Sequence, residues 1–255
     1  KKLMWINVVV SPARIIHYQM IHRDSFNLND SLDRAIVCAL NRVDAAHLSR
    51  VDSLILPDLF SADFLYYAPF PIKCDSLKEV PKCIFISYPL QAFAAYEFGK
   101  LIRWGPVSLG KQLTPTPTGL FHCNWKSRKA ISTINPEWIM EWYINLDNRL
   151  GVSMHQYDLP GYPASHACVR LLKQDAIFLY RWTDSWKLKD DWNIWSYGTP
   201  VIISGYYTYK TTRPWFKDGE MEQVNRNELE REVSKYHDIL LQRLGLSRDS
   251  VPVLP

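Results

Sequence analysis

The residues best able to do chemistry lie in one short stretch that holds His155, His166, Cys168 and Arg170. A thiolate is a strong nucleophile, but a free thiol is mostly protonated at neutral pH. An imidazole close to it can remove the proton and later return it to a leaving amine. A loop that contains Gly161 can bring the more distant histidine beside the cysteine. The stretch predicts a cysteine nucleophile with a histidine base, which requires neither a metal nor an organic cofactor.

Two other kinds of cysteine–histidine site fit the sequence less well. A zinc site from His155, His166 and Cys168 lacks a fourth ligand, and the five cysteines include no C-x-x-C pair. Papain-like proteases have the nucleophile before the histidine, whereas His155 precedes Cys168. Taken alone, a cysteine is most often a small core residue. Taken together, these residues favour catalysis.

The run Ser165-His166-Ala167-Cys168-Val169-Arg170 resembles the signature of the YkuD-type L,D-transpeptidase catalytic domain. That signature reads Ser-His-Gly-Cys, then a hydrophobic residue and Arg or Asn. Five more stretches resemble the family in the same order along the chain, namely residues 82–96, 106–111, 116–121, 151–155 and 198–201. The resemblance covers roughly residues 82–204. It departs from the family at Ala167, and the loop between His155 and Ser165 is shorter than in most relatives.

The resemblance implies a role for each residue around the nucleophile. Cys168 would attack, and His155 would act as its general base and later as the acid. The backbone carbonyl of Gln156 would orient the other ring nitrogen of His155. His166, beside the nucleophile, would shape the site.

The remaining residues of the signature would support the reaction. Backbone N–H groups of Ala167 and Cys168 would form the oxyanion hole. Arg170 would anchor the catalytic loop or meet a substrate carboxylate, and Ser165 would support the turn.

The reaction implied by the resemblance is acyl transfer on peptidoglycan stem peptides, through a thioester and with a 3→3 cross-link as product. Water as the acceptor would instead make the protein an L,D-carboxypeptidase, and an endopeptidase is also open. A catalytically inert wall-binding protein is the alternative from another class. Carbapenems are expected to acylate an active site of this type.

The expected fold is mainly β, a YkuD-type β-sandwich or partly closed barrel with flanking helices. Residues 1–80 are expected to form a helical lead-in, 81–205 the catalytic domain, and 206–255 an extension with an amphipathic helix. Residues 39–58 resemble the second half of a LysM wall-binding module. This resemblance predicts a wall glycan contact through the N-terminal segment.

Local patterns predict the main elements. Residues 13–60 read as mostly helical, with Asn29 or Ser31 as the cap of a helix over 32–40, and residues 1–10 as a first strand. Further strands are expected at 83–87, 138–146 and 201–203, and a hairpin joins 91–96 to 101–108. Residues 226–243 carry a helical apolar stripe, with Asn225 and Glu228 as a capping box and Gly245 as the stop.

Composition limits the function classes. The net charge is +4 and the cations are scattered among acids, which argues against nucleic-acid binding. No apolar run is long enough to span a bilayer. The family resemblance implies an exported envelope or periplasmic protein, and we expect its signal to be absent from this sequence. Cys74 and Cys83 are close enough in the sequence to form a disulfide, but the sequence alone does not decide whether they do. Five tryptophans could line a substrate groove or fill the core: Trp138, Trp142, Trp182, Trp186 and Trp195.

Overall fold

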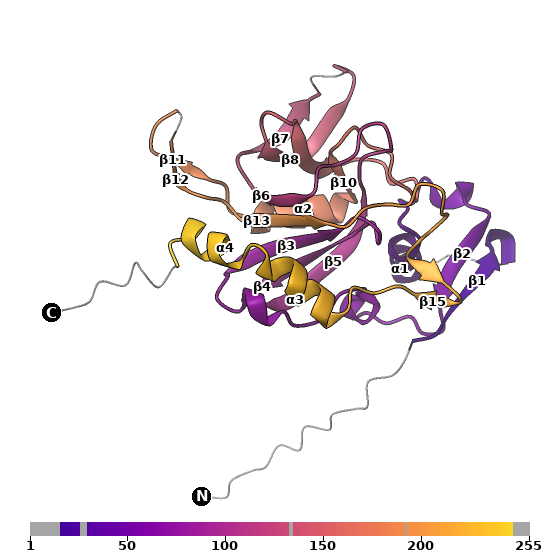
Figure 1. Ribbon diagram of the computed structural model, residues 1–255. Helices are drawn as coiled ribbons and strands as arrows, with labels where there is room; N and C mark the ends of the chain where they lie inside the picture. The colour runs from indigo at the N-terminus through magenta and orange to yellow at the C-terminus, as the bar shows by residue number, and fades with distance from the viewer. Residues whose placement is uncertain (1–15, 26–29, 133–134, 192, 247–255) are drawn as a thin grey trace, which may run out of the picture.

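A computed structural model of the chain describes residues 16–25, 30–132, 135–191 and 193–246. Within these residues, nine strands form one sheet in the order β6-β13-β3-β4-β5-β10-β9-β8-β7 (Figure 1). Neighbouring strands run antiparallel except at the β13–β3 and β9–β10 pairs, which are parallel. The strands, in chain order, are β3 (Lys82–Ser87), β4 (Ala92–Glu97), β5 (Lys100–Ser108), β6 (Gly119–His122), β7 (Lys126–Ile131), β8 (Ile139–Asp147), β9 (Val152–Gln156), β10 (Val169–Leu171) and β13 (Pro200–Ser204).

The sheet curls until its two ends meet. Just after β6, the backbone N–H of Cys123 donates to Thr199 O at 2.9 Å, beside β13. The next residue, Asn124, donates its backbone N–H to Asn145 O of β8 at 2.8 Å. Helix α2 (Lys173–Trp182) packs against β8 and β9. The mainly β, partly closed architecture with flanking helices is therefore confirmed.

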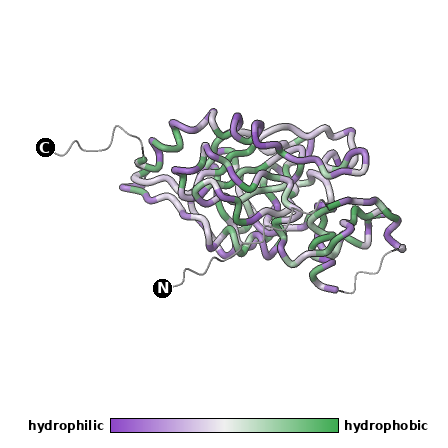
Figure 2. Tube along the Cα trace, turned by 90° about the horizontal axis from the view of Figure 1, so that it is seen from below, coloured by the Kyte–Doolittle hydropathy of each residue, from purple (hydrophilic) through white to green (hydrophobic). Residues whose placement is uncertain are grey.

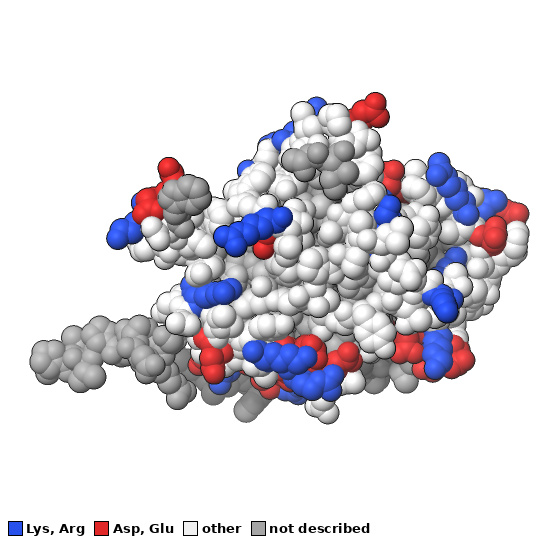
Figure 3. Space-filling view, turned by 45° about the horizontal axis from the view of Figure 1, so that its top comes forward, with Lys and Arg blue, Asp and Glu red and all other residues white. Residues whose placement is uncertain are grey.

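The core fills the inside of this curled sheet. Strand β4 is buried on both faces, with every residue from Ala92 to Tyr96 fully covered. A strand buried on both faces reads as a continuous apolar run, as the sequence of β4 does. Figure 2 shows the hydrophobic stretches of the chain running through the middle of the molecule. On the face seen in Figure 3, the described Lys and Arg side chains are interspersed with Asp and Glu, and form no single basic field.

Several predicted strands are confirmed. Strands β4 and β5 form the expected hairpin through a tight turn in which Phe98 (φ 45°) and Gly99 (φ 73°) both have left-handed backbone. Strands β3 and β13 lie where strands were expected. The strand expected at 138–146 is β8, but a bulge interrupts its alternation at Trp142, whose φ is 55°.

The expectation of a mostly helical N-terminal lead-in is wrong for the described residues. One helix, α1 (Ser31–Asn41), lies beside a two-stranded antiparallel sheet of β1 (Tyr18–His22) and β2 (Ser53–Pro57). Strand β2 is buried from Leu54 to Pro57, so its backbone groups need a partner strand, and β1 supplies it. The helix cap is Asp30, whose carboxylate accepts from Leu32 N at 2.7 Å. The first strand expected at 1–10, and Asn29, lie outside the described residues.

The C-terminal extension holds two helices where one was expected. Helix α3 (Arg226–Ser234) ends before Tyr236, whose backbone leaves helical geometry, and α4 (His237–Arg243) follows. Asn225 caps α3 by accepting from Glu228 N at 2.9 Å, as expected. Gly245, with φ 68°, follows the end of α4.

The remaining elements are short. They comprise two small hairpins and four single 3-10 turns: β11 (Lys187–Leu188) with β12 (Ile194–Ser196), β14 (Phe216–Lys217) with β15 (Glu220–Met221), Arg23–Ser25, Leu48–Arg50, Phe64–Tyr67 and Asp75–Leu77. No helix among the described residues has both the length and the apolarity that crossing a bilayer requires. All five cysteines are free thiols, Cys74 and Cys83 among them.

Candidate active site

Two parallel strands present the chemical residues on one face of the sheet. In β9, Val152 and Met154 point into the core, so Ser153 and His155 face the other side. Strand β10 begins directly after Cys168, and its Arg170 is paired in register with His155. The alternation of both strands therefore brings the nucleophile and base candidates to the same side.

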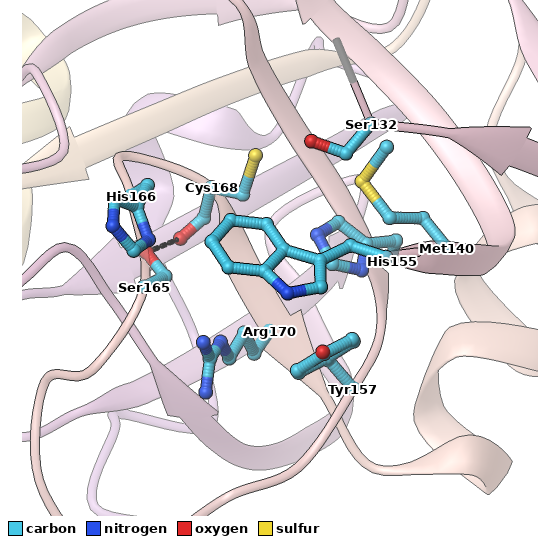
Figure 4. Close-up of a pocket in the computed structure, with 9 residues that line it drawn as sticks. Ser132, Met140, His155, Tyr157, Ser165, His166, Cys168 and Arg170 are labelled. Carbon is cyan, nitrogen blue, oxygen red and sulfur yellow. Dashed lines mark hydrogen bonds between the residues drawn. The ribbon is translucent and has the colours of Figure 1, made fainter. Parts of the chain in front are cut away.

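A small pocket of about 40 Å³ collects most of the predicted site residues (Figure 4). The residues that line it are Ser132, Trp138, Met140, His155, Tyr157, Ser165, His166, Cys168 and Arg170. A second, larger cavity of about 460 Å³ shares Ser132, Met140, His166 and Cys168 with the first. Cys168 thus lies where two cavities meet.

The thiol of Cys168 rests on β9 and on the turn before it. Ser153 Oγ donates to Cys168 Sγ at 3.2 Å, and Sγ lies 3.6 Å from the Gly151 carbonyl, to which the thiol proton can be donated. Burial raises the pKa of Cys168, although the hydrogen bonds from Ser153 and the charge of Arg170 act to lower it. In the view of Figure 4 the sulphur is directed toward the Ser132 side of the pocket. Among the described residues, the hydrogen-bond partners of Sγ are Ser153 and Gly151 and do not include His155.

His155 is buried as a neutral imidazole. Its Nδ1 lies 3.0 Å from Gln156 O, and a carbonyl only accepts, so Nδ1 carries the proton. Burial lowers the pKa of His155 to about 4, against the opposing effect of the Gln156 hydrogen bond and helped by the charge of Arg170. The ring stacks on Tyr143, with centroids 6.3 Å apart. Nε2 therefore has a free lone pair at neutral pH, as a general base requires.

His166 is held by a cation. Lys111 Nζ donates to His166 Nε2 at 3.0 Å, which leaves the proton of the neutral ring on Nδ1. Burial lowers the pKa of His166, and the charges of Lys111 and Arg170 lower it further. The ring packs on Trp138 at 5.0 Å between centroids. His166 is therefore oriented as a wall of the pocket, with no lone pair free to take a proton.

Ser165 ties the catalytic turn to its surroundings. Its Oγ donates to Cys168 O at 2.5 Å, and its backbone bonds Leu109 and Lys111 at 3.0 Å each. Among the hydrogen bonds of the described residues, none uses the backbone N–H of Ala167 or Cys168. Neither N–H group therefore has a protein partner among the described residues.

Ala167 has a φ of 77°, in the left-handed region where side chains with a Cβ are strained. Such a conformation costs an alanine about 1–2 kcal/mol relative to the right-handed one. The family signature has glycine at this position, which adopts the conformation without that cost.

We expect Ala167→Gly to stabilise the protein by about 0.5–1 kcal/mol, because strain relief exceeds the added freedom of the unfolded chain. Urea unfolding would measure this. Ala164→Gly in the same loop is the matched control, because Ala164 is outside the left-handed region, and it should destabilise. Equal losses in both variants would contradict the strain at Ala167.

Arg170 lies across the pocket from the turn. Its guanidinium stacks over the ring of Tyr157 at 4.6 Å from the centroid, and Nη1 donates to Asp158 O at 3.4 Å. Burial lowers the pKa of Arg170, with nearby Tyr157 and Asp158 acting against it. The side chain both holds the loop after β9 and lines the pocket.

Sequence reasoning missed Lys111 and Ser153. Ser153 could have been found from alternation, because it lies two residues before His155 on the same strand face. Lys111 had no such signal, since its contact with His166 depends on how two loops meet. Of the five tryptophans that could line a groove or fill the core, Trp138 lines the pocket, whereas Trp195 is 74% exposed on β12. The described residues contain no cluster of three or more His, Cys, Asp or Glu side chains able to hold a metal.

The N-terminal unit, formed by β1, α1, β2 and the loops between them, directly holds the loop between His155 and Cys168. Asp44 N donates to Leu159 O at 2.9 Å, and Leu159 N donates to the Asp44 carboxylate at 2.8 Å. Val43 forms an isolated antiparallel bridge with Pro160. The carboxylate also binds His47 Nδ1 at 2.9 Å. The lead-in is therefore part of the scaffold of the site.

Comparison with known proteins gives one family match. The family model described as the YkuD L,D-transpeptidase catalytic domain matches residues 81–203. No curated protein matches the chain.

Solved structures with a similar fold include three L,D-transpeptidases. The one from Stackebrandtia nassauensis is 22% identical, covers 50% of this chain and 57% of its own, and has a TM-score of 0.41. The one from Mycobacterium smegmatis is 20% identical, covers 49% and 59%, and has a TM-score of 0.39. A third, in complex with imipenem, is 21% identical with the same coverage and TM-score. The match spans less than two thirds of each of these chains.

Proposed function

Because residues 81–203 belong to the L,D-transpeptidase catalytic domain family, we propose that this protein is a cysteine-dependent L,D-transpeptidase that cross-links peptidoglycan stem peptides. The observation that carries the proposal is the position of Cys168 at the junction of two cavities. A transferase must bring a donor and an acceptor to opposite sides of one acyl-enzyme. Two cavities that both reach the thiol fit that need.

The reaction begins with the donor stem in the pocket. The thiol leaves the Gly151 carbonyl, gives its proton to His155 Nε2, and Sγ attacks the carbonyl between the third residue and the terminal D-alanine. The N–H groups of Ala167 and Cys168 bind the oxyanion. The C–N bond breaks, His155 returns the proton to the leaving amine, and a thioester remains on Cys168.

The acceptor then completes the transfer. The side-chain amine of a second stem attacks the thioester, His155 takes its proton, and Sγ leaves as the 3→3 cross-link forms. Arg170 binds a stem carboxylate through its guanidinium. Water in place of the amine would give a tripeptide and make the protein an L,D-carboxypeptidase. These substrates require an envelope location, and the protein is exported there in this proposal.

One incubation tests the proposal. Purified protein is mixed with a tetrapeptide stem, and the products are read by mass spectrometry. A cross-linked dimer with release of D-alanine is the expected result. A tripeptide without dimer would replace the transpeptidase with the carboxypeptidase. No turnover, although Cys168 reacts with small thiol reagents, would favour an inert wall-binding protein, for which the LysM-like segment at 39–58 is the motivation.

A carbapenem gives an independent readout of the same machinery. Its strained β-lactam carbonyl is a target for a thiol with an oxyanion hole, and ring opening adds the whole molecule. We expect one adduct per chain, on a peptide that contains Cys168. Intact-mass measurement followed by digestion would locate it. An adduct on any other cysteine would contradict the assignment of the nucleophile.

A further inference from the structure

A further cavity lies against the loop between His155 and Cys168 and is lined mostly by residues outside the matched domain. Its volume is about 430 Å³, within the usual size range of ligand sites. Its wall combines three separate parts of the chain: Asn41, Arg50 and Val51; Pro160, Gly161, Tyr162 and Pro163; and Tyr207, Tyr209, Lys210, Thr211, Thr212 and Arg213. Only the middle group belongs to residues 81–203, so the cavity exists because the N-terminal unit and the C-terminal extension meet this domain.

The charge of this cavity has one sign. Arg50, Lys210 and Arg213 contribute three cations, and the described residues that line it include no Asp or Glu. Arg213 is fixed, because its Nη2 donates to Ser53 O at 2.7 Å and its Nη1 to Ser53 Oγ at 3.3 Å. The described residues show no further hydrogen-bond partner for its guanidinium. A fixed arginine beside two exposed cations is suited to carboxylate or phosphate.

The other lining residues suit a saccharide or peptide chain. Tyr162 exposes 57% of its surface, and Tyr207 packs edge-on against Tyr209 at 5.2 Å. Tyrosine offers a flat apolar face with a polar tip, and the hydroxyls of Thr211 and Thr212 add hydrogen-bonding groups. The cavity is therefore an amphipathic anion site.

The cavity and the Cys168 pocket share one thin wall. Pro163 lines the first and Ser165 the second, and two residues of chain span at most about 7 Å. The same loop is held to strand β5, where Ser108 Oγ donates to Tyr162 O and accepts from Ala164 N. An extended four-residue peptide spans about 14 Å, longer than that wall.

We propose that this cavity binds a carboxylate-bearing part of a peptidoglycan strand whose stem reaches Cys168. The proposal rests on the transpeptidase function argued above, and it adds a substrate subsite built by residues outside the matched domain. The carboxylate is favoured over phosphate because a stem peptide carries carboxylates and continues into the neighbouring pocket. A phosphate-bearing wall polymer is the competing occupant.

Binding to the Cys168→Ala protein tests this inference without turnover. The ligand is a disaccharide tetrapeptide, called the muropeptide below, and its affinity is measured by calorimetry at several salt concentrations. The variant is Arg50→Glu with Lys210→Glu, because both side chains are exposed, whereas Arg213 supports Ser53. The control is Lys189→Glu, an exposed lysine in the β11–β12 hairpin at the opposite end of the molecule (Figure 1).

The double variant should bind the muropeptide about tenfold or more weakly, with a flatter salt dependence, and the control should stay within about twofold. The same charge changes are also made in the protein that keeps Cys168. Its rate of acylation by a carbapenem reports the catalytic pocket alone. The ratio of muropeptide affinity to acylation rate should therefore fall about tenfold. An unchanged ratio would overturn the inference, even where stem peptides are turned over.

Two further ligands distinguish the occupants. Amidation of the muropeptide carboxylates should weaken its binding to the protein with an unchanged cavity. The loss should equal the loss that the double variant shows with the ordinary muropeptide. A glycerol phosphate oligomer should compete weakly. Tight binding of the phosphate oligomer, with none of the muropeptide, would overturn the carboxylate assignment. Failure of cross-linking together with charge-dependent muropeptide binding would instead count against the proposed function and support the subsite.

Discussion

Cys168→Ala should abolish stem-peptide turnover, with a loss on the order of 10⁴-fold or more, because no thioester can form without Sγ. Binding groups and the oxyanion donors would remain, but they cannot replace a nucleophile. The fold should be kept, because the thiol contacts only Ser153 and the Gly151 carbonyl at the edge of a pocket. Product formation followed by mass spectrometry measures the loss.

The other cysteines provide matched controls for this change. Cys38 lies in α1, and Cys123 follows β6; both are buried, and burial raises the pKa of Cys38 to about 11 and of Cys123 to about 12. Neither lines either of the two cavities that meet at Cys168. Cys38→Ala and Cys123→Ala should leave the rate constant nearly unchanged. Turnover that survives Cys168→Ala, or disappears in a control at equal folding, would overturn the mechanism.

Local patterns in the sequence predicted five of the nine strands of the large sheet, namely β3, β4, β5, β8 and β13, whereas β6, β7 and β10 were not predicted. The pairing of β4 with β5 could be predicted because the tight turn at Phe98 and Gly99 between two apolar runs is visible in the sequence. Strand β1 was missed because its five residues carry no clear alternation, and its pairing with β2 joins segments far apart in the chain. The break between α3 and α4 was missed because an apolar stripe continues across Tyr236.

The residues of the site that could be predicted lie in one short stretch, and those that could not are brought together only by the fold. His155 and Cys168 could be named because one short stretch carries them, and Ala167 could be recognised as a strained position from its departure from glycine. Lys111 and Asp44 could not be named. Their partners, His166 and Leu159, lie 55 and 115 residues further along the chain, and only the folded loops bring them together. The anion cavity depends on three separate segments and has no sequence signature.

His155→Gln should reduce turnover by about 10²–10⁴-fold, because Gln has no basic nitrogen to accept the thiol proton. Glutamine can still donate to the Gln156 carbonyl, so the fold should tolerate the change. His166→Ala should reduce turnover less, because Lys111 occupies the lone pair of His166 Nε2. If His166→Ala proves the more damaging change at equal folding, the roles of the two histidines are reversed.

The pH profile distinguishes a lost base from a structural effect. With the pKa of His155 lowered to about 4, the neutral ring persists down to that pH, and protonation below it removes the base. The pH profile of kcat/KM reports the ionisation of the substrate-free enzyme. It should therefore fall on the acid side with an apparent pKa near 4, well below the 6.5 of an ordinary histidine. His122→Gln is the matched control, because burial lowers the pKa of His122 to about 4 as well, and it lies outside both cavities that meet at Cys168. The acid limb should remain in His122→Gln and disappear in His155→Gln. A limb near 6.5 in the unchanged protein would mean that the resting imidazole is not held neutral by burial.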